Sequence, residues 1–155
     1  MHAAPKSTAR RKAGGVIARQ IQPSGHLEEA WGAPAAATIE AVRAGLPIEE
    51  LESLRAALDL PMEKVVEKLG IARATLHRRK QSGRLTPDES DKVLRFARLV
   101  RQAAEVFDGI AESRAWLTFP QHGLGGAIPL DYARTEGGAR QVEALLWRIE
   151  YGVYS

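Results

Sequence analysis

The amino-acid sequence predicts an all-α protein. From Ala36 onward, apolar residues recur at spacings of three and four, which places them on one face of a helix. Glycine and proline interrupt this pattern at several points and mark helix ends, as at Gly70, Gly83, Pro87 and Gly109. No segment shows the sustained period-two alternation of β-branched residues that would indicate a strand. We therefore expect helices joined by short turns.

Residues 1–35 differ in composition from the rest of the chain. They are rich in alanine, glycine, proline and basic residues, and residues 1–27 hold five basic residues and no acid. Such a segment buries too little apolar surface to offset the entropy lost on ordering. We predict a flexible basic arm over residues 1–35. The net charge of +3 comes from residues 1–27, since residues 28–155 hold 17 basic and 19 acidic residues.

Several function classes lack the residues they need. The chain has no cysteine, and its four histidines lie far apart, so no metal site is expected. The glycine-rich stretch at 122–129 lacks the GK[ST] ending of a phosphate-binding loop, and we read it as a connector between short helices. No nucleophile or carboxylate set has a catalytic spacing, so we expect neither an enzyme nor a cofactor. No apolar run is long enough to span a membrane, and a cytoplasmic protein is expected.

The stretch at 61–84 predicts a helix-turn-helix. Val65, Val66 and Leu69 line the inner face of a first short helix, and Ile71 and Leu76 point into the same core. Gly70 lies between the two helices and permits the left-handed backbone that a tight turn requires. Two features depart from the usual pattern, because Val66 stands where a small residue is common and Ala72 offers no side-chain cap.

The second helix of this pair is basic. Between Glu67 and Asp88 the sequence holds six Lys or Arg residues and no acid. With Leu76 turned inward, the outward face would read base edges of operator DNA in the major groove through Arg73, Ala74, His77 and Arg78. Flanking phosphates would be contacted by Arg79, Lys80 and Arg84. The alternative is an ordinary solvated basic face.

A long helix is predicted from Pro87 to Phe107. Thr86 is placed as its N-cap, Pro87 suits the first helical position, and Glu89 completes a capping box, while Gly109 lies beyond its end. The helix would be about 30 Å long. Its apolar face is so broad that we expect packing on two sides, one within the chain and one against a second copy. This predicts a homodimer.

The last helix of the sequence carries two apolar stripes. One contains Val142, Leu145, Leu146 and Ile149, and the other, rotated by about 100°, contains Trp147, Tyr151 and Tyr154. The first stripe would face the core of the C-terminal domain. The aromatic stripe either completes that small core or binds a protein partner, and Trp147 could do the former while the end of the chain does the latter.

The C-terminal third resembles the toxin-binding domain of the MbcA/ParS/Xre antitoxins, and residues 69–99 resemble the Xre-like helix-turn-helix that precedes it in that family. The resemblance covers residues 45–155 and rests on Trp116, Leu117, Leu124, Gly125, Gly126, Pro129, Leu130, Thr135, Gly137 or Gly138, Val142, Leu145 and the run from Arg148 to Tyr154. The order of the two motifs makes it specific.

The resemblance implies an antitoxin of a type II toxin-antitoxin system. Its partner would be a RES-domain toxin that consumes NAD, and the antitoxin would block the active site of the toxin and repress their shared operon. We expect a helix-turn-helix and dimerisation region at 36–108 and a toxin-binding domain at 109–155. The expected toxin contacts are Trp147, Tyr151, Gly152, Val153, Tyr154 and Ser155. The alternative is a stand-alone transcription regulator with a ligand-sensing or dimerisation domain.

Overall fold

A computed structural model describes residues 33–152, and within them every regular element is a helix. The helix-turn-helix half contains α2 (Ala33–Ala44), α3 (Glu49–Leu58), α4 (Met62–Leu69) and α5 (Arg73–Ser82). The long helix α6 (Pro87–Val106) follows. The C-terminal half contains α7 (Ile110–Thr118), a short 3-10 turn η1 (His122–Leu124), α8 (Pro129–Tyr132) and α9 (Glu136–Glu150). The all-α prediction is confirmed, whereas the arm predicted at 1–35 lies almost wholly outside the described residues.

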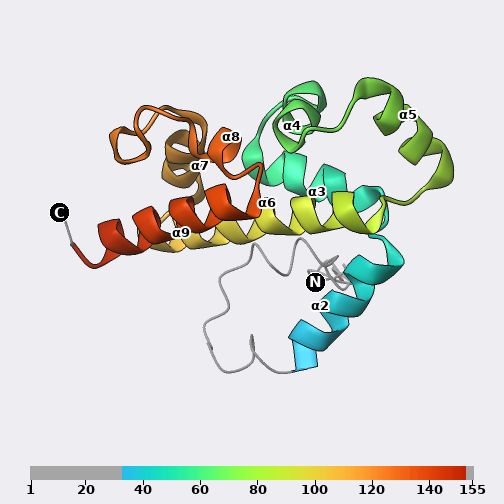
Figure 1. Cartoon of the computed structure of the whole chain (residues 1–155), viewed down its shortest axis with the longest axis horizontal. Helices are drawn as coiled ribbons and strands as arrows, with labels where there is room; N and C mark the ends of the chain where they lie inside the picture. Colours follow the sequence, from blue (N-terminus) through green and yellow to red (C-terminus); the bar gives the residue numbers. More distant parts are fainter. Residues whose placement is uncertain (1–32, 153–155) are drawn as a thin grey trace, which may run out of the picture.

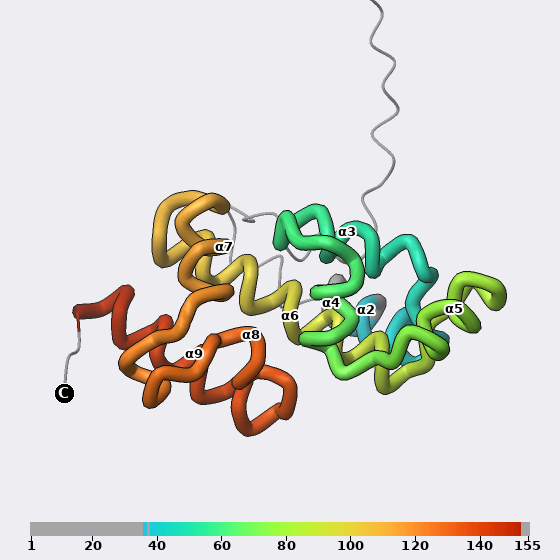
Figure 2. Tube along the Cα trace, turned by 90° about the horizontal axis from the view of Figure 1, so that it is seen from above, coloured from blue at the N-terminus to red at the C-terminus, as the bar shows by residue number. Residues whose placement is uncertain are grey.

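Helix α6 forms the spine of the molecule. In Figures 1 and 2 it runs through the centre, with α3, α4 and α5 along one half of its length and α7, α8 and α9 along the other. Helices α2, α3 and α4 pack against it from the N-terminal half of the chain, and α7 and α9 pack against it from the C-terminal half. The two halves therefore share one central helix.

The start of α6 follows the predicted capping box. The Glu89 backbone N–H donates to Thr86 Oγ1 at 3.2 Å, and the Thr86 backbone N–H donates to Glu89 Oε1 at 2.9 Å, with Pro87 in the first turn. Ser90 continues this junction, because its buried hydroxyl accepts from the Leu46 N–H at 2.8 Å and donates to the Thr86 carbonyl at 2.7 Å. Both terminal donors satisfied by the box would otherwise lack partners.

Gly109 lies beyond the other end of α6, as predicted, where it precedes α7. The left-handed residue at this end is Asp108, at φ 52°, whereas Gly109 is extended. The Gly109 N–H donates to the Ala104 carbonyl at 3.2 Å, which satisfies one of the last carbonyls of the helix. Aspartate tolerates this backbone region better than most residues do, so it can replace glycine here.

The broad apolar surface of α6 is covered within a single chain. Its buried apolar residues are Val93, Leu94, Phe96, Ala97, Leu99, Val100 and Ala103. They join one core that runs from Leu46 and Leu51 in the first half to Val142 and Leu146 in the second. The expectation that α6 keeps an uncovered side for a second copy is wrong, because α7 and α9 occupy that side. The apolar face of α6 therefore gives no support to a homodimer.

Candidate DNA-reading and partner-binding surfaces

Helices α4 and α5 form the predicted helix-turn-helix. Gly70 has the left-handed φ of +74°, and the Ile71 N–H donates to the Val66 carbonyl at 2.8 Å. This bond closes the C-terminal end of α4, and the side chains of Val66 and Ile71 are both buried there. Helix α5 begins at Arg73 after Ala72, which provides no side-chain cap, as the sequence predicted. The inward face of α4 is likewise confirmed, because Val65 and Leu69 are buried.

Helix α5 exposes most of its surface. None of its residues is fully buried, and its inward anchor is Leu76, which packs against the core while remaining partly accessible. Its exposed residues include five of those predicted to meet DNA: Arg73, Ala74, His77, Arg78 and Lys80. The helix also projects at one end of the molecule in both views (Figures 1 and 2). Among the described helices, none covers this outward face of α5.

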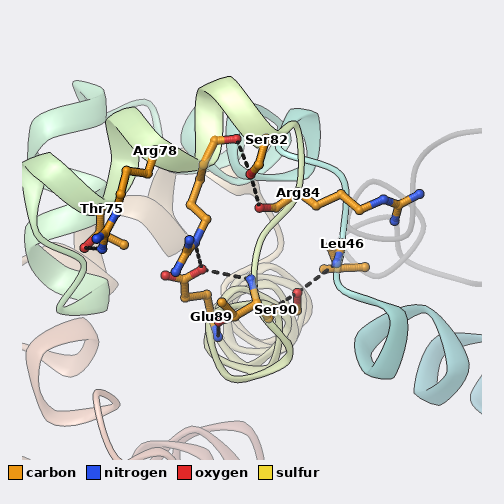
Figure 3. Close-up of polar contacts among 9 residues, drawn as sticks. Leu46, Thr75, Arg78, Ser82, Arg84, Glu89 and Ser90 are labelled. Carbon is orange, nitrogen blue, oxygen red and sulfur yellow. Dashed lines mark hydrogen bonds and ion pairs between the residues drawn. The ribbon is translucent and has the colours of Figure 1, made fainter.

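Two polar contacts order this outward face. Arg78 Nη2 donates to Thr75 Oγ1 at 3.2 Å, one turn earlier, and both residues are drawn in Figure 3. Gln81 Nε2 lies 3.4 Å from His77 Nε2. Gln81 was not among the predicted DNA contacts, although its position four residues after His77 places it on the same face. Its amide adds a second hydrogen-bonding group to the surface.

Three of the six basic residues between Glu67 and Asp88 bind atoms of the protein outside that stretch. Arg79 Nε donates to Glu89 Oε1 at 2.6 Å, Arg84 Nη1 donates to the Gly45 carbonyl at 2.8 Å, and Lys68 Nζ donates to an Asp131 oxygen at 2.9 Å. These partners lie outside the acid-free window. The phosphate-contacting roles of Arg79 and Arg84 stay predictions, but the structure gives both side chains a part in holding α5 and its following turn.

Glu89 joins the reading helix to α6. Figure 3 shows its carboxylate between α5 and the start of α6, beside Ser90. Burial raises the pKa of the Glu89 carboxyl, but the hydrogen bonds from Arg79 and Thr86 outweigh burial and hold the pKa below its ordinary value of 4.5. The carboxylate is thus charged at neutral pH and pairs with a guanidinium that is itself largely buried, at 23% side-chain exposure.

The aromatic stripe of α9 is exposed. Trp147 is 51% and Tyr151 is 61% accessible. Their rings are in contact, with centroids 4.8 Å apart and planes tilted by 44°, and this tilted pair is called the aromatic stack below. The alternative in which Trp147 completes the domain core is therefore wrong. The other stripe faces inward as predicted, with Val142 and Leu146 fully buried. A rigid pair of large aromatic rings remains on the surface with no covering element among the described residues.

Helix α9 ends at this pair of rings. Helix α9 ends at Glu150, and Gly152 has a left-handed φ of +64°, a conformation that glycine adopts without strain. The predicted contacts Val153, Tyr154 and Ser155 lie outside the described residues. Figure 1 places this end of α9 opposite the end that carries α5.

The glycine-rich stretch predicted as a connector lies between α7 and α8. Residues 122–129 contain η1 and lead into α8, and the Gln121 N–H donates to the Ala127 carbonyl at 3.0 Å, which closes the loop. Phe119, just before this loop, is 64% exposed and was not predicted as a surface aromatic. Within residues 33–152, no histidine and carboxylate side chains cluster as metal ligands, and no helix is long and apolar enough to cross a membrane.

Comparison with known proteins matches both halves of the chain. Residues 37–98 match the antitoxin Xre-like helix-turn-helix domain, and residues 102–152 match the antitoxin Xre/MbcA/ParS C-terminal toxin-binding domain. An Antitoxin Xre from Yersinia enterocolitica is 31% identical over 119 residues, which cover 76% of this chain and 80% of the relative. The chain belongs to this antitoxin family.

Other antitoxins show the same likeness. An Antitoxin Xre from Photorhabdus laumondii is 32% identical over 72% of this chain and 76% of the relative. One from Pseudomonas putida is 35% identical over 44% of this chain and 43% of the relative. The resemblance predicted from the sequence is thereby confirmed. The two matched ranges of the antitoxin meet within α6, between residues 98 and 102, and the domain boundary predicted at residue 109 stays a prediction.

Proposed function

We propose that this antitoxin neutralises a RES-domain toxin that consumes NAD, and that α5 reads operator DNA to repress their shared operon. The exposed Trp147–Tyr151 stack carries the first part of the proposal, because it lies on the domain that matches the toxin-binding family and no described residue covers it. Large aromatic rings on a rigid helix are the typical anchors of protein interfaces. The match to a toxin-binding domain also favours this function over a stand-alone regulator.

The segment after the stack would enter the active site of the toxin. Gly152 redirects the chain at the end of α9, so that residues 153–155 can leave the helix axis and reach into a cleft while Trp147 and Tyr151 hold its rim. An aromatic side chain such as Tyr154 suits a pocket that binds the base of a dinucleotide. Blocking of the toxin would then need both the anchor, which is the pair of Trp147 and Tyr151, and the probe, which is residues 153–155.

Co-expression with the toxin tests this proposal. Replacing Trp147 and Tyr151 together by alanine should leave the melting temperature near that of the wild type, because both side chains are exposed, and should weaken toxin binding by about 2 kcal/mol or more, roughly thirtyfold. Tyr132→Ala is the matched control, since Tyr132 is an exposed aromatic on α8, away from the end of α9. Full neutralisation by the double variant would contradict the proposal.

Deletion of residues 153–155 isolates the probe from the anchor. The truncated antitoxin should still bind the toxin through the aromatic stack but should release NAD consumption, while its thermal stability and DNA binding stay unchanged. Binding of the toxin and its NAD turnover are measured on the same samples. A truncated chain that still inhibits turnover fully would remove these residues from the blocking mechanism.

We further propose that α5 reads operator DNA as one of a pair. One reading helix covers only one half-site, and two copies related by a two-fold axis match a palindromic operator. Since α6 is covered within the chain, the homodimer must use another surface or form on the DNA itself. Light scattering of the free antitoxin and of its complex with operator DNA measures the number of chains. A single chain on the DNA would contradict the pairing.

A further inference from the structure

The toxin-binding domain holds the turn that precedes the reading helix. Arg134 lies between α8 and α9, and its guanidinium donates from Nη2 to the Glu67 carbonyl at 2.8 Å and from Nε to the Lys68 carbonyl at 3.3 Å. Both carbonyls belong to the last turn of α4, where backbone acceptors lack helical partners and the helix dipole favours a cation. The local cap from the Gly70 and Ile71 N–H groups is thus supplemented by two donors from the other half of the chain.

An ion pair reinforces the same junction. Lys68 Nζ lies 2.9 Å from Asp131 Oδ1, and the Lys68 side chain is only 17% exposed. Lys68 of α4 reaches across to Asp131 of α8, and Arg134, which follows α8, reaches back to the carbonyls of α4. The side chain of Arg134 also borders Gly70, since a Cβ placed there would lie 3.9 Å from Arg134 Cδ. The turn is therefore held on two sides.

Arg134 and its contacts with α4, called the Arg134 clamp below, are also anchored to α6. Arg95 of α6 is 8% exposed, and its Nη1 donates to the Arg134 carbonyl at 3.1 Å. Its other donors bind Glu136 Oε2 at 3.1 Å and Asp91 Oδ2 at 2.9 Å. The backbone of Arg134 is thus tied to α6, and the guanidinium of Arg134 reaches α4 from this fixed point.

The direction of α5 depends on its two ends. Because no residue of α5 is fully buried, its inward packing is slight, and the helix is held at its far end by the Arg79–Glu89 pair and by the Ile48 N–H, which donates to the Gly83 carbonyl at 2.9 Å. Its near end starts three residues after Gly70. We propose that Arg134, supported by Asp131, is a positioning residue for DNA reading that the toxin-binding domain supplies. This inference rests on the proposed operator binding by α5.

The test uses the full chain and two DNA duplexes of equal length. One carries the sequence directly upstream of the reading frame of the antitoxin, and the other carries the same bases in shuffled order. Arg134→Ala is compared with Arg140→Ala, which removes the same charge from α9 and disturbs only an exposed pair with Glu136. We expect Arg134→Ala to lose about tenfold more affinity than Arg140→Ala on the upstream duplex and an equal, small amount on the shuffled one.

Two further variants keep the test decisive if Arg134→Ala folds poorly. Arg134→Lys keeps the charge and one donor and should recover part of the loss, and Asp131→Asn leaves Arg134 in place and should lose about threefold. Equal losses for Arg134→Ala and Arg140→Ala on both duplexes, or wild-type discrimination in both milder variants, would overturn the positioning role. If the wild type itself does not distinguish the duplexes, operator reading by α5 fails, and this inference fails with it.

Discussion

The Arg79–Glu89 pair should stabilise the fold by an amount that acid removes. Glu89→Gln keeps an acceptor for the Thr86 N–H, so the capping box survives and only the charge is lost. A charge-assisted hydrogen bond contributes about 1.5–3 kcal/mol, and the cost of burying the carboxylate offsets part of it. We expect the variant to be less stable than the wild type by about 1–2 kcal/mol at pH 7.

The pH dependence identifies the charge as the cause. Since folding lowers the pKa of Glu89, the stabilisation is complete above its ordinary value of 4.5 and is lost as the pH falls through the lower value of the folded state. The difference between wild type and Glu89→Gln should therefore shrink from pH 7 toward pH 3. Urea unfolding followed by circular dichroism measures it at each pH.

An exposed acid on the same helix provides the control for this experiment. Glu105→Gln makes the same chemical change on α6 at an exposed position and should alter the unfolding free energy little at any pH. Two results would refute the reasoning. One is a Glu89→Gln variant as stable as the wild type at pH 7, and the other is a difference between the two proteins that stays constant down to pH 3.

Further predictions concern the reading helix and the spine. Arg73→Ala and Arg78→Ala should each weaken operator binding by about 1–3 kcal/mol in gel-shift titrations, and unchanged affinity of the double variant would remove α5 as the reader. Lys80→Ala should weaken binding to all sequences alike and reduce the salt dependence. Phe96→Ala empties a site of 1% exposure and should cost about 3–5 kcal/mol, with circular dichroism and tryptophan fluorescence reporting one shared transition.

The sequence was sufficient wherever neighbouring residues determine the geometry. The capping box of Thr86 and Glu89, the left-handed Gly70 and the inward stripe of α9 all depend on residues a few positions apart, whose spacing fixes which face they share. The exposed aromatic stripe was recognised as a second face. The sequence alone did not decide whether this second face is exposed or buried, because a small core can also accommodate a tryptophan such as Trp147.

Contacts between distant segments lay beyond what the sequence predicts. An apolar face as broad as that of α6 must be covered, but its pattern does not say whether α9 or a second copy covers it. The same holds for the basic window, in which Lys68 and Arg84 find partners 63 and 39 residues away. Counting the window as free positive charge therefore overestimated the cations available to DNA. Asp108 shows a local limit, since the sequence pattern did not mark it as the left-handed residue that follows α6.

The shared spine explains why the two surfaces of this antitoxin depend on one fold. One family match ends at residue 98 and the other begins at residue 102, both inside α6. Leu99 and Val100 between them are buried in the core that spans both halves, so dividing the helix here would open that core. The reading helix and the aromatic stack nevertheless lie at opposite ends of the molecule (Figure 1). A partner that contacted only the stack would therefore leave α5 uncovered. Among the described residues, the two surfaces are connected through α6 and through the Arg134 clamp, the contacts of Arg134 with α4.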